Sequence, residues 1–146
     1  MKIIYSNGQV AECPAEEELH VIRHTAAHIM AQAVKRLYPN TKLAIGPATD
    51  DGFYYDFDVE KPFSPDDLAA LEDEIKKIAK EDIALVRRSV TPDEAREIMS
   101  ARGETYKLEL IDEHAAKGDD ITLYEQGDLL ICVQDLTLCP PVLLRL

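Results

Sequence analysis

The chain has 146 residues, with 16 lysines and arginines against 28 aspartates and glutamates, which gives a formal charge of −12 at pH 7. This length suits a single domain, and a hydrophobic share of 46% is enough for a packed core and argues against wholesale disorder. A strongly acidic chain is a poor stand-alone binder of nucleic acid, because neutralising phosphates supplies most of that affinity. If it binds a nucleic acid, we expect it to contact only one end of that molecule, while another domain or protein binds the rest.

The sequence predicts neither a membrane-spanning segment nor disulfide bonds. No apolar run approaches the roughly 18 residues that span a bilayer, and no basic-then-apolar leader opens the chain. Cys13, Cys132 and Cys139 form an odd set without zinc spacing. We therefore expect a soluble cytoplasmic protein with no membrane partner.

The first half of the chain predicts two helices and several short strands. In order, we expect a hairpin, a long helix, two strands and a second helix, over residues 1–10, 16–37, 41–45, 53–57 and 65–80. Asn7-Gly8 is a turn signal, and Pro39 ends the long helix. Ser64 followed by Pro65 is typical of a helix start. The core face of the long helix is predicted from apolar residues at helical spacing, namely Leu19, Ile22, Ala26, Ile29, Ala33 and Leu37.

The second half predicts mostly strands. We expect, in order, a strand, a helix that closes at Gly103, a strand, a polar loop and two further strands, over residues 84–90, 92–103, 106–111, 114–120, 121–124 and 129–133. The connections 45–53 and 111–121 are too short for parallel crossovers. The fold class is therefore predicted as α+β with a mainly antiparallel sheet.

Three histidines are the first candidates for chemistry. His20, His24 and His28 are four residues apart, so they share one face of the long helix. The pair His24 and His28 has the spacing by which a helix offers two imidazoles to a metal or a substrate. The same spacing is common by chance, and a metal site needs further ligands, so a structural pair is the alternative. We expect His20 to lie on the surface.

Other candidates are weaker on the residues alone. Lys107 opens the predicted strand 106–111, where it could direct a cation into a cleft or lie solvated at the strand edge. Tyr54 and Tyr55 alternate faces of a strand, so we expect one in the core and the other along a groove. Glycine-rich phosphate cradles are absent from the sequence.

Several motifs, taken together, resemble a known family. Residues 22–28 read Ile-Arg-His-Thr-Ala-Ala-His, residues 44–47 read Ala-Ile-Gly-Pro, residues 51–58 read Asp-Gly-Phe-Tyr-Tyr-Asp-Phe-Asp, and residues 103–107 read Gly-Glu-Thr-Tyr-Lys. In order and spacing, this series resembles the editing domain of bacterial threonyl-tRNA synthetase over residues 16–128. The resemblance implies an antiparallel sheet packed around a long central helix.

The resemblance also implies an activity and its residues. The family's domain hydrolyses serine mistakenly attached to threonine tRNA, and it works without zinc or another cofactor. His24, His28 and Lys107 match its catalytic positions. We expect Tyr54, Tyr106 and Cys132 to contact the substrate. The implied partners are the serine-carrying 3′ end of tRNA(Thr) and the remainder of the synthetase.

Both ends of the chain depart from the family pattern. Residues 1–15 resemble only the first hairpin of a ubiquitin-like module, residues 16–128 match the editing domain, and residues 129–146 are atypical. The family continues after residue 128 with an Asp-x-Cys-x-Gly-Pro-His type segment, whereas this chain has no histidine beyond His114. Reading permitted codons of residues 128–138 in another frame spells Phe-Val-Asp-Leu-Cys-Ala-Gly-Pro-His-Leu. The simplest hypothesis is one base lost near the Asp128 codon.

This departure predicts weak or absent editing, because the family's second histidine is missing and Cys132 only approximates the place of its cysteine. Two alternatives stay open. One is a non-catalytic module that binds the tRNA acceptor end, and the other is a zinc-dependent hydrolase of the alanyl type.

Overall fold

The structure is a computed structural model that describes residues 2–4, 9–44, 46, 48–118, 121–127, 129–133 and 142–143. Four helices cover this part of the chain: α1 (Glu18–Leu37), α2 (Pro65–Lys80), α3 (Pro92–Ala101) and α4 (Thr105–Ala116). The strands are β1 (Lys2–Ile4), β2 (Val10–Glu12), β3 (Lys42–Leu43), β4 (Phe57–Asp58), β5 (Leu85–Val90), β6 (Ile121–Gln126), β7 (Leu129–Val133) and β8 (Val142–Leu143). No helix in these ranges is long and apolar enough to cross a bilayer.

The strands form three small antiparallel sheets rather than one. Their orders are β2-β1-β8, β3-β4 and β5-β6-β7. The α+β class and the antiparallel pairing are thereby confirmed. Within the third sheet, β6 pairs on both sides, with Leu123 opposite Arg88 in β5 and opposite Cys132 in β7.

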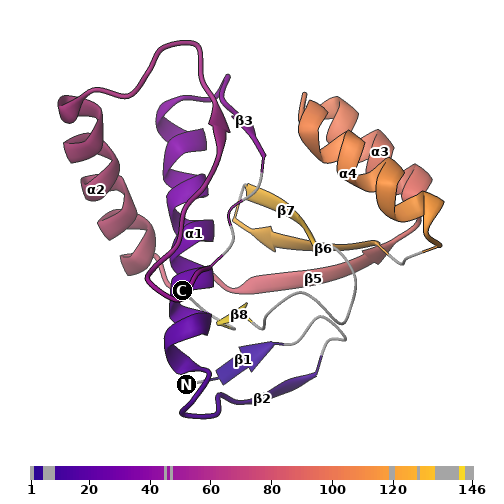
Figure 1. Cartoon of the computed structure of the whole chain (residues 1–146), viewed down its shortest axis with the longest axis horizontal. Helices are drawn as coiled ribbons and strands as arrows, with labels where there is room; N and C mark the ends of the chain where they lie inside the picture. Colours follow the sequence, from indigo (N-terminus) through magenta and orange to yellow (C-terminus); the bar gives the residue numbers. More distant parts are fainter. Residues whose placement is uncertain are drawn as a thin grey trace.

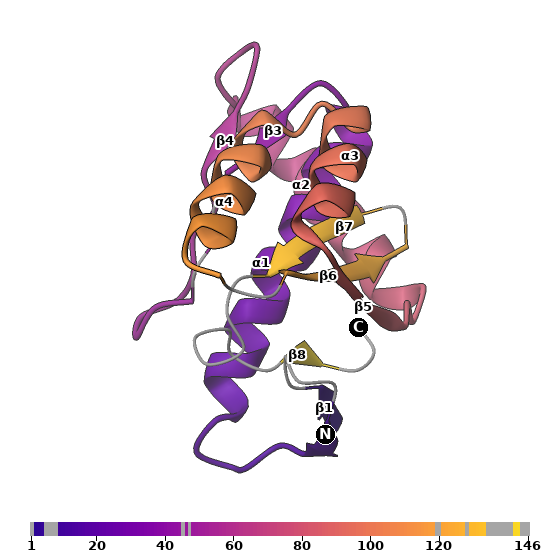
Figure 2. The same cartoon turned by 90° about the vertical axis from the view of Figure 1, so that its right-hand side faces the viewer.

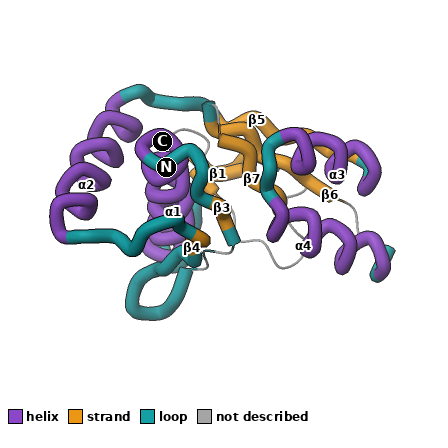
Figure 3. Tube along the Cα trace, turned by 90° about the horizontal axis from the view of Figure 1, so that it is seen from above, coloured by secondary structure: helices purple, strands orange, loops and turns teal. Residues whose placement is uncertain are grey.

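The helices cover the sheets on two sides (Figure 1). Helix α1, the longest at 20 residues, contacts α2 along one side and β7 and β8 along the other. Helices α3 and α4 lie side by side and contact β6 (Figure 2). Seen from above, α2, α1, the β5-β6-β7 sheet and the α3–α4 pair follow one another across the molecule (Figure 3).

Strand β6 is buried toward both neighbouring helical layers. Leu123 packs in a cluster with α3 and α4 residues such as Met99 and Ile111, whereas Tyr124 packs with Ala31 of α1. This alternation is the period-two pattern of a strand with both faces covered. The strand thus separates the α1 side of the molecule, which carries the candidate histidines, from the α3–α4 side.

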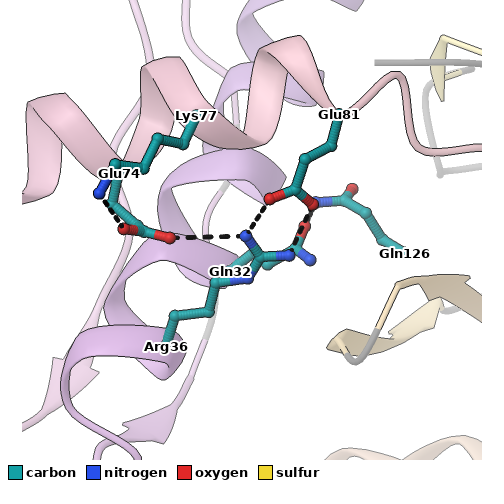
Figure 4. A network of polar contacts seen from close by, with 6 residues as sticks. All are labelled: Gln32, Arg36, Glu74, Lys77, Glu81 and Gln126. Carbon is teal, nitrogen blue, oxygen red and sulfur yellow. Dashed lines mark hydrogen bonds and ion pairs between the residues drawn. The ribbon is translucent and has the colours of Figure 1, made fainter.

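Arg36 links α1 to α2 through two carboxylates (Figure 4). Its guanidinium donates to both carboxylate oxygens of Glu81, at 2.6 and 2.8 Å, and lies 3.5 Å from Glu74. Beside it, the buried Gln126 of β6 donates to Gln32 of α1 at 2.7 Å. The figure therefore shows how α1 is joined to the helix on one side and to the sheet on the other.

The predicted strand over residues 106–111 is wrong, because this segment belongs to helix α4. The predicted polar loop 114–120 is also helical as far as Ala116. The alternation of Tyr106 with Leu108 and Leu110 suggested a strand. The buried residues are instead Lys107, Ile111 and His114, whose spacing of four and three is helical.

Two further expectations need correction. Within residues 53–57 only Phe57 lies in a named strand, and Phe53 forms an isolated bridge with Ala48 across a tight loop. The core face of α1 is also displaced from the prediction. Leu19 and Ile22 are about half exposed, at 58% and 47%, and the buried face includes polar residues, namely Thr25, His28 and Gln32. The hydrophobic pattern missed this face because it counts only apolar side chains.

Candidate functional site

His24 and His28 lie in ring contact on α1. Because residues four apart in a helix stack on one face, the two imidazoles meet with centroids 4.4 Å apart and an interplanar angle of 62°. His20, one turn earlier, is exposed as predicted. The α1 face that carries the pair is therefore polar where the histidines sit.

Three ring nitrogens of this pair are buried without a hydrogen-bond partner among the described residues. They are both nitrogens of His24 and Nδ1 of His28. Buried polar atoms are nearly always paired in folded proteins, because an unpaired one costs roughly 1–3 kcal/mol. An arrangement with three such atoms in one place is typical of a site that receives a ligand or water.

Both imidazoles are held in the neutral form. Burial, with a smaller contribution from the charge of His20, lowers the pKa of His24 to about 4. Burial also lowers the pKa of His28 well below its usual value, with added contributions from His24 and Lys107. Neutral imidazoles at pH 7 have a free lone pair, so they can accept a proton from water but cannot serve as general acids.

The structure brings Lys107 to this pair from the other side of the molecule. Lys107 lies in the first turn of α4, is 4% exposed, and donates from Nζ to the Ala44 carbonyl at 2.9 Å. Its charge is close enough to His28 to lower the pKa of that imidazole. The three predicted catalytic residues therefore come together, although Lys107 arrives on a helix and not on the predicted strand.

The three predicted substrate contacts are placed differently. Tyr54 is 48% exposed and Tyr55 packs against the core beside Phe57, so one tyrosine lies in the core as expected, although neither belongs to a strand. Tyr106 is 37% exposed, and its hydroxyl donates to Asp58 Oδ2 at 3.0 Å, which raises the pKa of Tyr106. The backbone of Cys132 lies in β7, and its side chain falls outside the described part of the structure.

Two cavities lie near the C-terminal end of α1. One of about 290 Å³ is lined by Tyr38, Phe63 and Asp67, and another of about 190 Å³ by Gln32, Lys35 and other residues. Neither is lined by His24 or His28. Nor do three histidine, cysteine, aspartate or glutamate side chains gather as a metal site in residues that the structure describes.

Sequence reasoning missed one buried residue next to the site, Glu104. It is 5% exposed and immediately precedes α4. Its carboxylate accepts from the Leu43 backbone N–H at 3.2 Å and lies 3.0 Å from Lys35 Nζ. Glu104 lies three residues before Lys107, and at the start of a helix residues with this spacing share a face. The sequence analysis missed this relation because it predicted a strand for residues 106–111.

The chain is similar in sequence to known bacterial proteins. No protein-family model matches the chain. It is 57% identical over 108 residues to the threonine–tRNA ligase of Acetivibrio thermocellus, covering 74% of this chain and 17% of that protein. It is 46% identical over 128 residues to that of Thiobacillus denitrificans, with 86% and 20% covered, and 51% identical over 115 residues to that of Carboxydothermus hydrogenoformans, with 79% and 18% covered.

The chain spans only about a fifth of the length of these relatives. Identities of 46–57% over three quarters or more of the chain nevertheless hold across relatives from different bacteria. By sequence, the chain therefore corresponds to one segment of bacterial threonine–tRNA ligases.

Proposed function

We propose that this chain carries the editing site of its family, which hydrolyses the serine ester at the 3′ end of tRNA(Thr). The observation that carries the proposal is the pair of buried, neutral imidazoles with three unpartnered ring nitrogens beside a buried lysine. On this proposal the partners are the serine-carrying 3′ end of the tRNA and the remainder of the synthetase, in the cytoplasm.

Threonine and serine differ by one methyl group, which explains why such a site is needed. A binding pocket that accepts threonine rejects the smaller serine by only ~1–3 kcal/mol, too little for accurate protein synthesis. A second site that hydrolyses the wrong ester supplies the missing discrimination. The formal charge of −12 fits this division of labour, because the tRNA body must then be held elsewhere.

The reaction needs a positioned water and a place for negative charge. Water attacks the ester carbonyl carbon of the seryl group, a proton leaves the water, and the carbonyl oxygen becomes an oxyanion before the bond to the ribose oxygen breaks. In our proposal a neutral imidazole of His24 or His28 orients the water and accepts its proton, and the imidazolium so formed gives that proton to the ribose oxygen as the ester bond breaks. The ammonium group of Lys107 stabilises the developing oxyanion.

We propose further that editing by this chain is weak. The family resemblance assigns a cysteine and a second histidine to the segment after residue 128, and this chain has no histidine after His114. Of the five side chains that the resemblance assigns to the site, this cysteine and histidine are then missing, whereas His24, His28 and Lys107 are present. Binding of the aminoacylated 3′ end with little turnover follows from this composition.

The test compares this chain with one repaired variant by two measurements, and it uses His24→Ala as the negative control. A non-hydrolysable seryl-adenosine analogue measures binding, and deacylation of seryl-tRNA(Thr) measures turnover. Both are applied to this chain and to a variant whose residues 129–138 are replaced by Phe-Val-Asp-Leu-Cys-Ala-Gly-Pro-His-Leu. We expect both chains to bind the analogue and only the replaced variant to turn over quickly, with both effects lost in His24→Ala.

The outcomes separate the possibilities. Fast, His24-dependent turnover by the unaltered chain would overturn the proposed impairment. Binding without turnover in both chains would favour a non-catalytic module for the tRNA acceptor end. If neither chain binds or hydrolyses, the editing site itself is refuted.

A further inference from the structure

Two side chains at the start of α4 are bound to the backbone of two neighbouring residues, at the end of β3 and just after it. Glu104 accepts a hydrogen bond from the Leu43 N–H at 3.2 Å, and Lys107 donates to the Ala44 carbonyl at 2.9 Å. Residues three apart at a helix start share a face, so both side chains reach the same short stretch of backbone. One end of α4 is thereby held in register with the end of β3.

Glu104 is also connected to α1, the helix of the histidine pair. Its second carboxylate oxygen lies 3.0 Å from Nζ of Lys35, which in turn donates to the carbonyls of Pro39 at 3.1 Å and Thr41 at 2.9 Å. Lys35 lies seven residues after His28, which is two helical turns along the same face. The α1 face therefore meets the start of α4 at two points, with Lys35 beside Glu104 and His28 near Lys107.

The burial of Glu104 and Lys107 is unusual for charged residues. Among the residues that the structure describes, Glu104 is the only buried carboxylate and Lys107 the only buried lysine or arginine. A buried charge is costly unless its contacts are specific, so each needs the geometry that the other helps to set. A helix whose first turn was exposed to solvent would not need either the Glu104 contacts or the Lys107 contact.

We propose that Glu104 is a positioning residue for Lys107: by holding the start of α4 against Leu43 and Lys35, it places the Lys107 ammonium beside His28. Glu104 does not touch the substrate and acts through Lys107. This inference rests on the proposed editing site for its functional consequence, but the placement of Lys107 can be measured without any substrate.

The functional test is a double-mutant cycle on the full chain, read by affinity for the non-hydrolysable seryl-adenosine analogue. Glu104→Gln should weaken binding about tenfold, which corresponds to the loss of one buried charge-assisted contact. The same change in a Lys107→Met background should cost no more than about twofold, because the residue that Glu104 positions is already gone. Glu109→Gln, at an exposed glutamate of the same helix, is the matched control and should change nothing.

A substrate-free readout is the pKa of His28, followed by NMR titration of its ring. Burial is the main cause that lowers this pKa, and electrostatic contributions from His24 and Lys107 add to it. If Lys107 leaves its place in Glu104→Gln, the pKa of His28 rises toward its usual value, because a nearby cation is lost. If Lys107 stays, removing the negative charge of Glu104 can only leave that pKa unchanged or lower it further.

Glu104→Asp keeps the experiment informative if the glutamine variant fails to fold. The shorter side chain retains the charge but cannot reach both Lys35 and Leu43, so we expect the same loss of affinity and the same rise in the pKa of His28. An unchanged or lowered pKa in these variants, or equal losses with and without Lys107, would overturn the positioning role. A wild-type chain that does not bind the analogue, combined with a raised pKa in the variants, would refute the editing site and leave the positioning intact.

Discussion

Acidification should destabilise this fold through its buried imidazoles, and His24 allows the size of the effect to be worked out. The pKa of His24 falls from 6.5 to about 4 on folding, because burial disfavours the charged ring. Between pH 7 and pH 5 the unfolded chain therefore gains a proton that the folded chain does not. The free energy of unfolding should fall by about 2 kcal/mol over this range through His24 alone. His28, whose pKa is also lowered, acts in the same direction.

Urea unfolding of the wild type and of His24→Gln at pH 7, 6 and 5 measures this. The glutamine cannot gain a proton, so its loss of stability between pH 7 and pH 5 should be smaller than that of the wild type by about 2 kcal/mol. Equal slopes for His24→Gln and the wild type would show that His24 takes up its proton over the same pH range in the folded and unfolded chains, and would refute the lowered pKa of His24.

Two other predictions concern local packing and capping. Gly46→Ala should lower the free energy of unfolding by roughly 1–3 kcal/mol, because its Cβ would lie 2.0 Å from the Tyr55 ring, whereas Gly52→Ala, with no atom within 4 Å, should leave thermal unfolding almost unchanged. Ser64→Ala should cost about 1 kcal/mol in chemical unfolding, because it removes the side chain that accepts from the Asp67 N–H in the capping box of α2. Equal stability of Gly46→Ala and Gly52→Ala would contradict the close packing of Gly46 against Tyr55. A Ser64→Ala variant as stable as the wild type would contradict the role of the capping box.

Helix α2 shows what local chemistry can predict. Its start after Ser64 and its end at Lys80 agree with the sequence-based expectation, because the capping box and Pro65 at the first turn define a helix start without reference to the rest of the fold. The α1 terminus at Leu37 is equally local, since Pro39 follows it closely. Sequence analysis therefore predicts the ends of a helix correctly where capping residues or a proline at those ends determine them.

The core face of α1 could not be found in the same way. The α1 segment with His28 and Gln32 is buried against a distant strand, where the Gln126 amide of β6 donates to the Gln32 side chain and to the His28 carbonyl. A hydrophobic pattern places such polar residues on the outside and assigns the neighbouring apolar stripe to the core. Leu19 shows the consequence, since it was expected in the core and is 58% exposed.

The error over α4 carries the most chemical meaning. On a strand, residues three apart point to opposite faces, so Glu104 and Lys107 could not both have reached β3. At the start of a helix they share one face, and the two side chains reach neighbouring residues, at the Leu43 N–H and the Ala44 carbonyl. The same first turn then delivers a buried cation to His28 and a buried carboxylate to Lys35. The helix is thus the condition for the lysine to meet the histidine pair, and any account of catalysis at this site depends on what holds that first turn in place.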